Sequence, residues 1–127
     1  MACPFCSPDP GRVALTPPLA WVLHDRYPVT PGHLLVVPRR HCAGWGDATV
    51  DERAALWASV DQARALALGD DPTIAGFNVG WNDGRAAGQT VMHLHVHVIP
   101  RRAGDVDDPR GGVRWVIPAK ARYWDDP

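Results

Sequence analysis

Residues 92–100 read Met-His-Leu-His-Val-His-Val-Ile-Pro, which places a histidine at every second position: His93, His95 and His97. A period of two is typical of a β-strand, whose successive side chains point to opposite faces. We therefore expect the three imidazoles to line one face of a strand. The residues that we expect to be buried on the other face are Leu94, Val96 and Val98. Three adjacent imidazoles indicate a chemical site, because histidine can ligate a metal, act as a nucleophile or donate to an anion near neutral pH.

The segment before the histidines, residues 82–90 (Asn-Asp-Gly-Arg-Ala-Ala-Gly-Gln-Thr), is rich in small and polar residues. Gly84 and Gly88 permit positive φ angles and a close approach of the backbone to a ligand. The neutral hydrogen-bond donors in this segment are Asn82, Gln89 and Thr90. A loop with exposed backbone N–H groups beside histidines is suited to binding a phosphate.

The remaining sequence predicts an α+β fold. Apolar runs indicate three more strands, at residues 19–25, 33–38 and 74–81. Thr49-Val50-Asp51-Glu52 has the form of a capping box and begins a helix with apolar residues at helical spacing, which ends near Asp70-Asp71-Pro72. Short loops between consecutive strands favour antiparallel pairing, so we expect an antiparallel sheet with at least one long helix packed on it.

Length and composition place limits on the function. A chain of 127 residues with a net charge of −1 is one domain and gives no electrostatic case for a nucleic-acid or membrane partner. No run approaches the ~18 apolar residues of a membrane span, and the N-terminus does not resemble a signal peptide. Three cysteines do not suggest a disulfide framework, so we expect a reducing, cytoplasmic location.

Residues 93–99 follow the pattern His-x-His-x-His-x-x, with apolar x, of the histidine triad (HIT) nucleotide-binding proteins. The chain resembles this family from Cys3 to about Arg102, including the segment 31–41 (Pro-Gly-His-Leu-Leu-Val-Val-Pro-Arg-Arg-His). The resemblance implies a sheet of about five strands, one long helix, a shorter helix and a homodimer. We accordingly assign residues 1–102 to a HIT domain and residues 103–127 to a C-terminal tail of the same domain.

Cys3-Pro4-Phe5-Cys6 is a Cys-x-x-Cys pair, which a metal site and a redox site both use. A redox pair is expected at a helix start after a strand, whereas this pair lies at the N-terminus. Similarity to the zinc-bearing branch of the HIT family implies a structural zinc held by Cys3, Cys6, His41 and His93. Four protein ligands would close the coordination shell, and unliganded thiols are the alternative. We expect Cys42 to be a small buried apolar residue.

The same resemblance makes His95 the catalytic nucleophile and His97 a donor to a phosphate oxygen or to the leaving group. The attacking ring nitrogen must be unprotonated, so the other nitrogen of His95 should donate to a backbone carbonyl. The phosphate contacts that the resemblance implies are Asn82, Gln89, Thr90 and backbone N–H groups near Gly88. It places His33 near the leaving group and Asp25 on the ribose hydroxyls. The alternatives are that Asp25 caps a strand end and that His33 is a surface residue.

Transferase and phosphorylase relatives carry Gln at the third triad position, so His97 favours a hydrolase. The resemblance implies purine nucleotide substrates cleaved at the α-phosphorus through a nucleotidyl-histidine, either nucleoside phosphoramidates or dinucleoside polyphosphates. The competing hypothesis is a non-catalytic, zinc-stabilised module that binds or senses nucleotides. A nucleic-acid-binding zinc module is disfavoured, because the basic residues form only the small pairs Arg39-Arg40 and Arg101-Arg102.

The tail carries the apolar run 113–117 (Val-Arg-Trp-Val-Ile), for which we expect a short strand or an arm. Arg114 and Trp115 are residue types that often anchor interfaces. Two roles for the tail remain open: selection of the leaving group across a dimer interface, and packing on its own chain.

Overall fold

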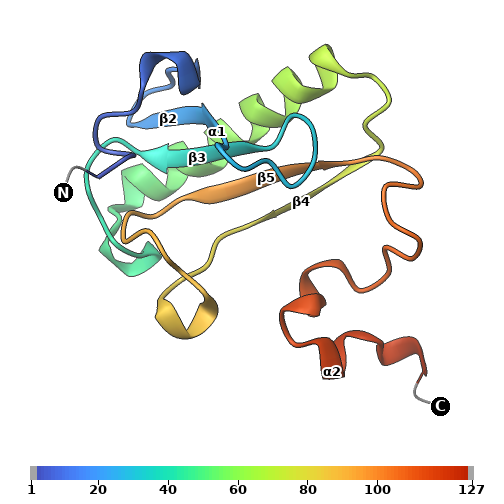
Figure 1. Ribbon diagram of the computed structural model, residues 1–127. Helices are drawn as coiled ribbons and strands as arrows, with labels where there is room; N and C mark the ends of the chain where they lie inside the picture. The colour runs from blue at the N-terminus through green and yellow to red at the C-terminus, as the bar shows by residue number, and fades with distance from the viewer. Residues whose placement is uncertain (1–2, 126–127) are drawn as a thin grey trace.

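The computed structural model describes residues 3–125, which form one five-stranded antiparallel sheet in the order β1-β2-β3-β5-β4. The strands are β1 (Val13–Leu15), β2 (Ala20–His24), β3 (Leu34–Pro38), β4 (Gly76–Gly80) and β5 (Val96–Arg101), as Figure 1 shows. The prediction of an antiparallel α+β fold is confirmed. The predicted strands at 19–25, 33–38 and 74–81 correspond to β2, β3 and β4, whereas β1 was not predicted.

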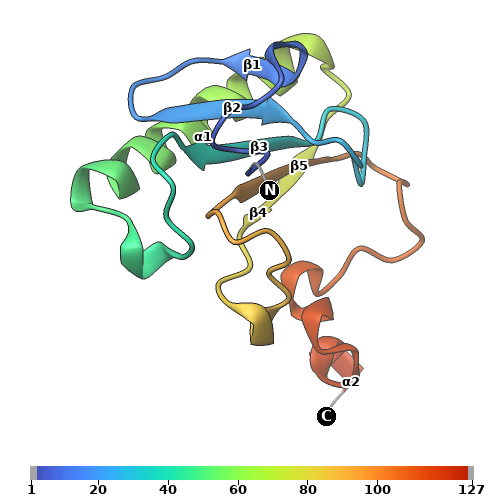
Figure 2. The ribbon, with the colours of Figure 1, turned by 60° about the vertical axis from the view of Figure 1, so that its left-hand side comes forward.

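One face of the sheet is covered by the long helix α1 (Val50–Asp70), which lies behind the sheet in Figures 1 and 2. The predicted capping box is present: the Thr49 hydroxyl accepts from the Glu52 N–H at 3.0 Å, and the Glu52 carboxylate accepts from the Thr49 N–H at 2.9 Å. Glu52 is also paired with Arg40 at 2.8 Å, and these hydrogen bonds lower the pKa of the Glu52 carboxyl to about 2. The start of α1 is therefore tied to the segment that carries His41.

The histidine stretch forms a regular strand only in part, which corrects the prediction for residues 92–100. β5 begins at Val96, so His93 lies in a bend and His95 in an irregular segment before the strand. The physical reason lies in β3, which ends at Pro38 and has no N–H there to continue the ladder. The N–H of Leu94 donates instead to the carbonyl of Cys42 at 2.8 Å.

The predicted alternation of faces is confirmed despite this break. The apolar residues that alternate with the histidines lie in the core against α1, and they are Leu94, Val96 and Val98. The other face of the sheet, here called the open face, is partly covered by the N-terminal segment. Phe5 packs there with Leu23, Leu35 and Val37 in a second, smaller core. Cys42 is 3% exposed and belongs to the main core, as expected.

The tail leaves the end of β5 and runs beside the sheet, shown in red in Figures 1 and 2. Its apolar run is neither a strand nor an extended arm: residues Gly112–Val116 form a 3₁₀-helix, followed by the short helix α2 (Pro118–Ala121) and a 3₁₀-helix at Tyr123–Asp125. Pro118 at the start of α2 suits a first helical position, where no backbone hydrogen bond is lost. Among residues 3–125, no helix is long and apolar enough to cross a lipid bilayer.

Candidate active site and metal centre

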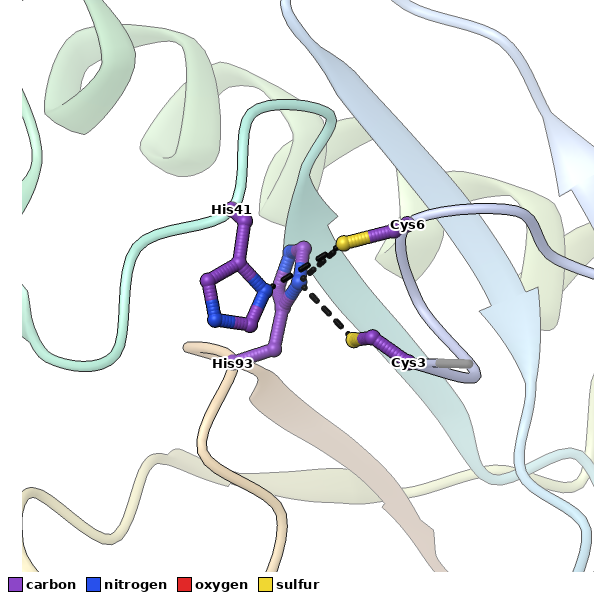
Figure 3. A group of neighbouring side chains, drawn as sticks. All are labelled: Cys3, Cys6, His41 and His93. Carbon is purple, nitrogen blue, oxygen red and sulfur yellow. Dashed lines mark hydrogen bonds between the residues drawn. The ribbon is translucent and has the colours of Figure 1, made fainter. Parts of the chain in front are cut away.

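The four residues of the predicted zinc site come together from three parts of the chain. Cys3 and Cys6 lie on the N-terminal segment, His41 follows β3, and His93 precedes β5 (Figure 3). One ligand atom from each residue lies within 4.8 Å of all the others.

The spacing of these atoms fits a tetrahedral metal. Zn–S and Zn–N bonds of about 2.3 and 2.0 Å imply S···N separations of about 3.5 Å along the edges of a tetrahedron. The Cys3 Sγ lies 3.3 Å and the Cys6 Sγ 3.5 Å from Nδ1 of His93. The Cys6 Sγ lies 3.2 Å from Nδ1 of His41. Two thiols and two imidazoles at these distances form a donor set that suits zinc.

The second nitrogen of His93 is held by the backbone. His93 is fully buried, and its Nε2–H donates to the carbonyl of Pro38 at 2.7 Å. Because a carbonyl only accepts, this bond fixes the tautomer and leaves a lone pair on Nδ1, which faces the thiols. Hydrogen bonds of this kind commonly orient histidine ligands. Burial lowers the pKa of His93, which favours the neutral ring that a metal requires.

His95 has the predicted hydrogen bond to a backbone carbonyl. Its Nδ1 lies 2.8 Å from the carbonyl oxygen of His93, so Nδ1 carries a hydrogen and the neutral ring presents its lone pair on Nε2. The ring is 9% exposed. Phe5 packs on it, with ring centroids 5.1 Å apart. Phe5 was not predicted as a site residue, although the sequence places it between the two cysteines.

His97, His33 and Asp25 form a second cluster on the open face. The N–H of Val29 donates to Nδ1 of His33 at 3.0 Å, so the hydrogen of His33 is on Nε2. This Nε2 lies 2.9 Å from Nδ1 of His97 and 3.3 Å from a carboxylate oxygen of Asp25. His33 therefore donates to His97, whose own hydrogen is then on Nε2.

Burial and the neighbouring histidines lower the pKa of His97 to about 4, so the ring is neutral at pH 7. His33 is 3% exposed, which excludes the alternative of a surface residue, and burial lowers its pKa. Asp25 also accepts from the N–H of Tyr27 at 2.7 Å, so it caps the turn after β2 as well as facing the histidines.

In the loop 82–90, two of the predicted phosphate-binding groups are already used in hydrogen bonds within the protein. The Gln89 side chain cannot bind phosphate in this arrangement, because its amide donates to the carbonyls of Ala43 and Val91 at 2.7 and 3.0 Å. Its carbonyl oxygen accepts from the N–H of Gly84 at 2.9 Å. The N–H of Gly88 is also used, because it bonds to the carbonyl of Arg85 within a 3₁₀-turn. Gln89 thus shapes the loop.

Two predicted phosphate contacts remain accessible. Thr90 is exposed, and Asn82 lines a cavity of about 770 Å³ on the open face. His33 and His97 line one part of this cavity, and Val113, Trp115 and Val116 of the tail line another. The tail therefore forms part of a pocket on its own chain. Arg114 and Trp115 make hydrogen bonds within the tail, to the carbonyls of Lys120 and Arg110.

Comparisons with known proteins agree with this geometry. Residues 8–104 match the model of the HIT domain. The chain is 41% identical over 106 residues to a Mycobacterium tuberculosis protein named AP-4-A phosphorylase, covering 82% of this chain and 53% of that protein. It is 34% identical over 99 residues to the bifunctional bis(5'-adenosyl)-triphosphatase/adenylylsulfatase FHIT of Arabidopsis thaliana, covering 78% of this chain and 54% of that protein. The chain thus spans about half the length of these curated relatives.

One solved structure is similar along its whole length. It is described as a Zn-bound histidine triad family protein from Mycobacterium smegmatis, with a TM-score of 0.75 and 30% identity. The match covers 100% of this chain and 99% of that one, so the tail lies within the matched region.

Proposed function

The chain belongs to the HIT family, and from this premise we propose that it hydrolyses purine nucleotide conjugates at the α-phosphorus, with His95 as the nucleophile. The observation that carries the proposal is the hydrogen bond between His95 and the carbonyl of His93, because it leaves Nε2 of His95 with a free lone pair. A nucleophilic imidazole divides one difficult displacement into two easier ones. The names of the two curated relatives support phosphoanhydride substrates of adenosine.

In the proposed reaction, Nε2 of His95 attacks the α-phosphorus and forms a P–N bond while the bond to the leaving group breaks. Nε2–H of His97 donates to a phosphate oxygen as charge develops there. Water then attacks the phosphorus, the P–N bond breaks, and the water proton is released as the nucleoside monophosphate leaves. Asn82 and Thr90 contact the phosphate, and Asp25 accepts from the ribose hydroxyls.

The protonation of His97 helps to choose between the two substrate classes. An amine leaves as a stable product only after it gains a proton, whereas a nucleoside polyphosphate can leave as an anion. His97 is neutral at pH 7, since its pKa is about 4, and it can donate a hydrogen bond but is a poor source of a full proton. Dinucleoside polyphosphates are therefore the favoured substrates, and the cavity beside His97, at about 770 Å³, has the size of a pocket for a nucleoside leaving group.

We also propose that the zinc is structural. Cys3, Cys6, His41 and His93 would hold it and leave no position for a substrate ligand, so the metal would supply folding free energy. The site requires reduced thiols, which supports the prediction of a cytoplasmic location. A homodimer remains a prediction; β4 is an edge strand of the sheet, and the tail lies beside it.

The experiment that tests this function is a turnover assay of the zinc-loaded protein with diadenosine triphosphate, diadenosine tetraphosphate and adenosine phosphoramidate. We expect AMP from the polyphosphates without added inorganic phosphate, a slower reaction of the phosphoramidate, and a burst that reports the covalent adduct. His95→Ala should lower turnover to below about 1% of the wild-type rate while AMP still binds, because the other contacts persist. His24→Ala, at the exposed end of β2, is the matched control.

Two results would contradict the proposal. A requirement for inorganic phosphate, with ADP as a product, would show that the protein is a phosphorylase. Nucleotide binding without any turnover would favour the non-catalytic sensing module.

A further inference from the structure

Phe5 stands between the two metal-ligating thiols in sequence and between the metal site and His95 in space. Its side chain is 5% exposed. The centroid of its ring lies 5.8 Å from that of His93, in an edge-on arrangement, and 5.1 Å from that of His95, at an interplanar angle of 50°. Phe5 therefore contacts a proposed metal ligand and the proposed nucleophile at the same time.

The Phe5 ring also packs on the sheet. Phe5 belongs to the small core on the open face, with the fully buried Leu23 and with Leu35 and Val37. The guanidinium of Arg12 lies 6.0 Å from the centroid of the ring. The ring thus packs on side chains of the sheet and is carried by the Cys3–Cys6 turn, whose two thiols face His93.

The ring of His95 needs such support. Its hydrogen bond to the His93 carbonyl fixes one atom, Nδ1, but a single bond leaves the imidazole free to tilt about that contact. In-line attack on phosphorus requires a defined direction of the Nε2 lone pair, and displacements of about 1 Å can lower a rate by about 10²-fold. A flat aromatic ring packed against the imidazole restricts this tilt.

We propose that Phe5 is a positioning residue for His95, through which metal binding at the N-terminus orders the nucleophile. This inference rests on the proposed role of His95. His93 supplies a parallel connection, because its side chain faces the thiols and its carbonyl holds His95. Metal binding then stabilises the fold and also orients the ring that reacts, although the metal touches no substrate.

The test compares zinc-loaded wild type, Phe5→Leu and Phe5→Ala as full chains, with Val13→Ala as the matched control on the edge of the same small core. Three quantities are measured: zinc content, kcat and KM with diadenosine tetraphosphate, and the ¹⁵N signals of the His95 ring. We expect both Phe5 variants to bind zinc. We expect kcat to fall about tenfold in Phe5→Leu and further in Phe5→Ala, with little change in KM.

The ¹⁵N signals of the His95 ring test the inference without requiring that a substrate be cleaved. In wild type and Val13→Ala, His95 should show one tautomer with a hydrogen-bonded Nδ1–H. In the Phe5 variants the tilting ring should weaken this bond to the His93 carbonyl, so the signals should be averaged. This result would support the inference even if no substrate were cleaved. Retention of a single Nδ1–H tautomer in Phe5→Leu, together with kcat within twofold of wild type, would overturn it. Should Phe5→Ala fail to fold, Phe5→Leu alone decides the outcome.

Discussion

The site contains two clusters built on histidine, the proposed metal cluster and the cluster of Asp25, His33 and His97. They differ in the backbone group that forms a hydrogen bond with the imidazole. In the metal cluster, the carbonyl of Pro38 accepts from Nε2–H of His93 and leaves the lone pair of Nδ1 facing two thiols. In the cluster of Asp25, His33 and His97, the N–H of Val29 donates to Nδ1 of His33, so Nε2 carries the hydrogen.

Proximity alone would have classed both clusters as metal sites, because the ligand atoms of Asp25, His33 and His97 also lie within 4.8 Å of one another. A histidine whose other nitrogen meets a backbone carbonyl can ligate a metal. A histidine whose other nitrogen meets a backbone N–H becomes a hydrogen-bond donor instead. The difference teaches that the backbone partner decides which ring nitrogen of His93 and of His33 carries the hydrogen, and the predictions below test the two clusters in turn.

The largest effect is expected when a ligand of the proposed zinc site is removed. Cys6→Ala should lose about one zinc per chain, and the free energy of unfolding should fall by about 4 kcal/mol, the value for a ligand present at about 1,000 times its Kd. Metal analysis and denaturant unfolding measure both quantities. Cys42→Ala, which removes a thiol outside the cluster, is the control for zinc content. Zinc retained at wild-type stoichiometry in Cys6→Ala would exclude this ligand set.

A smaller effect is expected when His33, the hydrogen-bond donor to His97, is replaced. His33→Asn removes the donor that fixes the tautomer of His97, so turnover should fall about 100-fold, within the usual range for a positioned acid–base group. Zinc content should be unchanged, because His33 is not a ligand. Steady-state kinetics and metal analysis test this, with His24→Asn as an exposed control. Loss of zinc in His33→Asn would show that the two clusters are not separate.

The smallest effect is on the pH dependence of stability. The pKa of His97 is about 4 in the folded chain, against about 6.5 when unfolded, so the unfolded chain binds more protons between these values. The contribution of neutral His97 to stability is therefore complete above pH 6.5 and is lost as the pH falls towards 4. The loss is at most about 3 kcal/mol, and solvent screening of the side chain, which is 25% exposed, reduces it.

The groups that face His97 are His95, His33 and Asp25. Denaturant unfolding of zinc-loaded wild type and His97→Asn over this window isolates the effect, because protonation of the metal ligands is common to both proteins. Parallel stability curves for the two proteins would show that burial of His97 is not the cause.

The features that follow from local chemistry could be read from the sequence. The alternation at residues 93–98 predicted the two faces of the histidine segment, and Thr49 with Glu52 predicted the start of α1. Features that depend on distant partners could not. The amide of Gln89 is used by the carbonyl of Ala43, which is 46 residues away in sequence, so its local pattern gave no sign that it was unavailable to phosphate.

The start of β5 and the tail were unpredictable for related reasons. β5 begins only at Val96 because the residues before it lie opposite Pro38 of β3, which has no N–H to donate. This register between the two strands cannot be predicted from local sequence propensity. The apolar run in the tail has the composition of a strand, but no strand within residues 3–125 pairs with it, and the glycines at its start adopt positive φ angles. The contacts of Phe5 with His93 and His95 also depend on the tertiary fold, so they could not be predicted from the sequence.

The separation of the proposed metal ligands along the chain has a consequence for biosynthesis. Cys3 and His93 are 90 residues apart, so the ligand set spans most of the polypeptide. The cysteines leave the ribosome first, but they cannot complete a four-ligand site until the triad segment has followed them out. Closure of so long a loop is slow compared with local helix formation. Newly made chains should therefore pass through an interval in which the two thiols are exposed to oxidants and to competing metals.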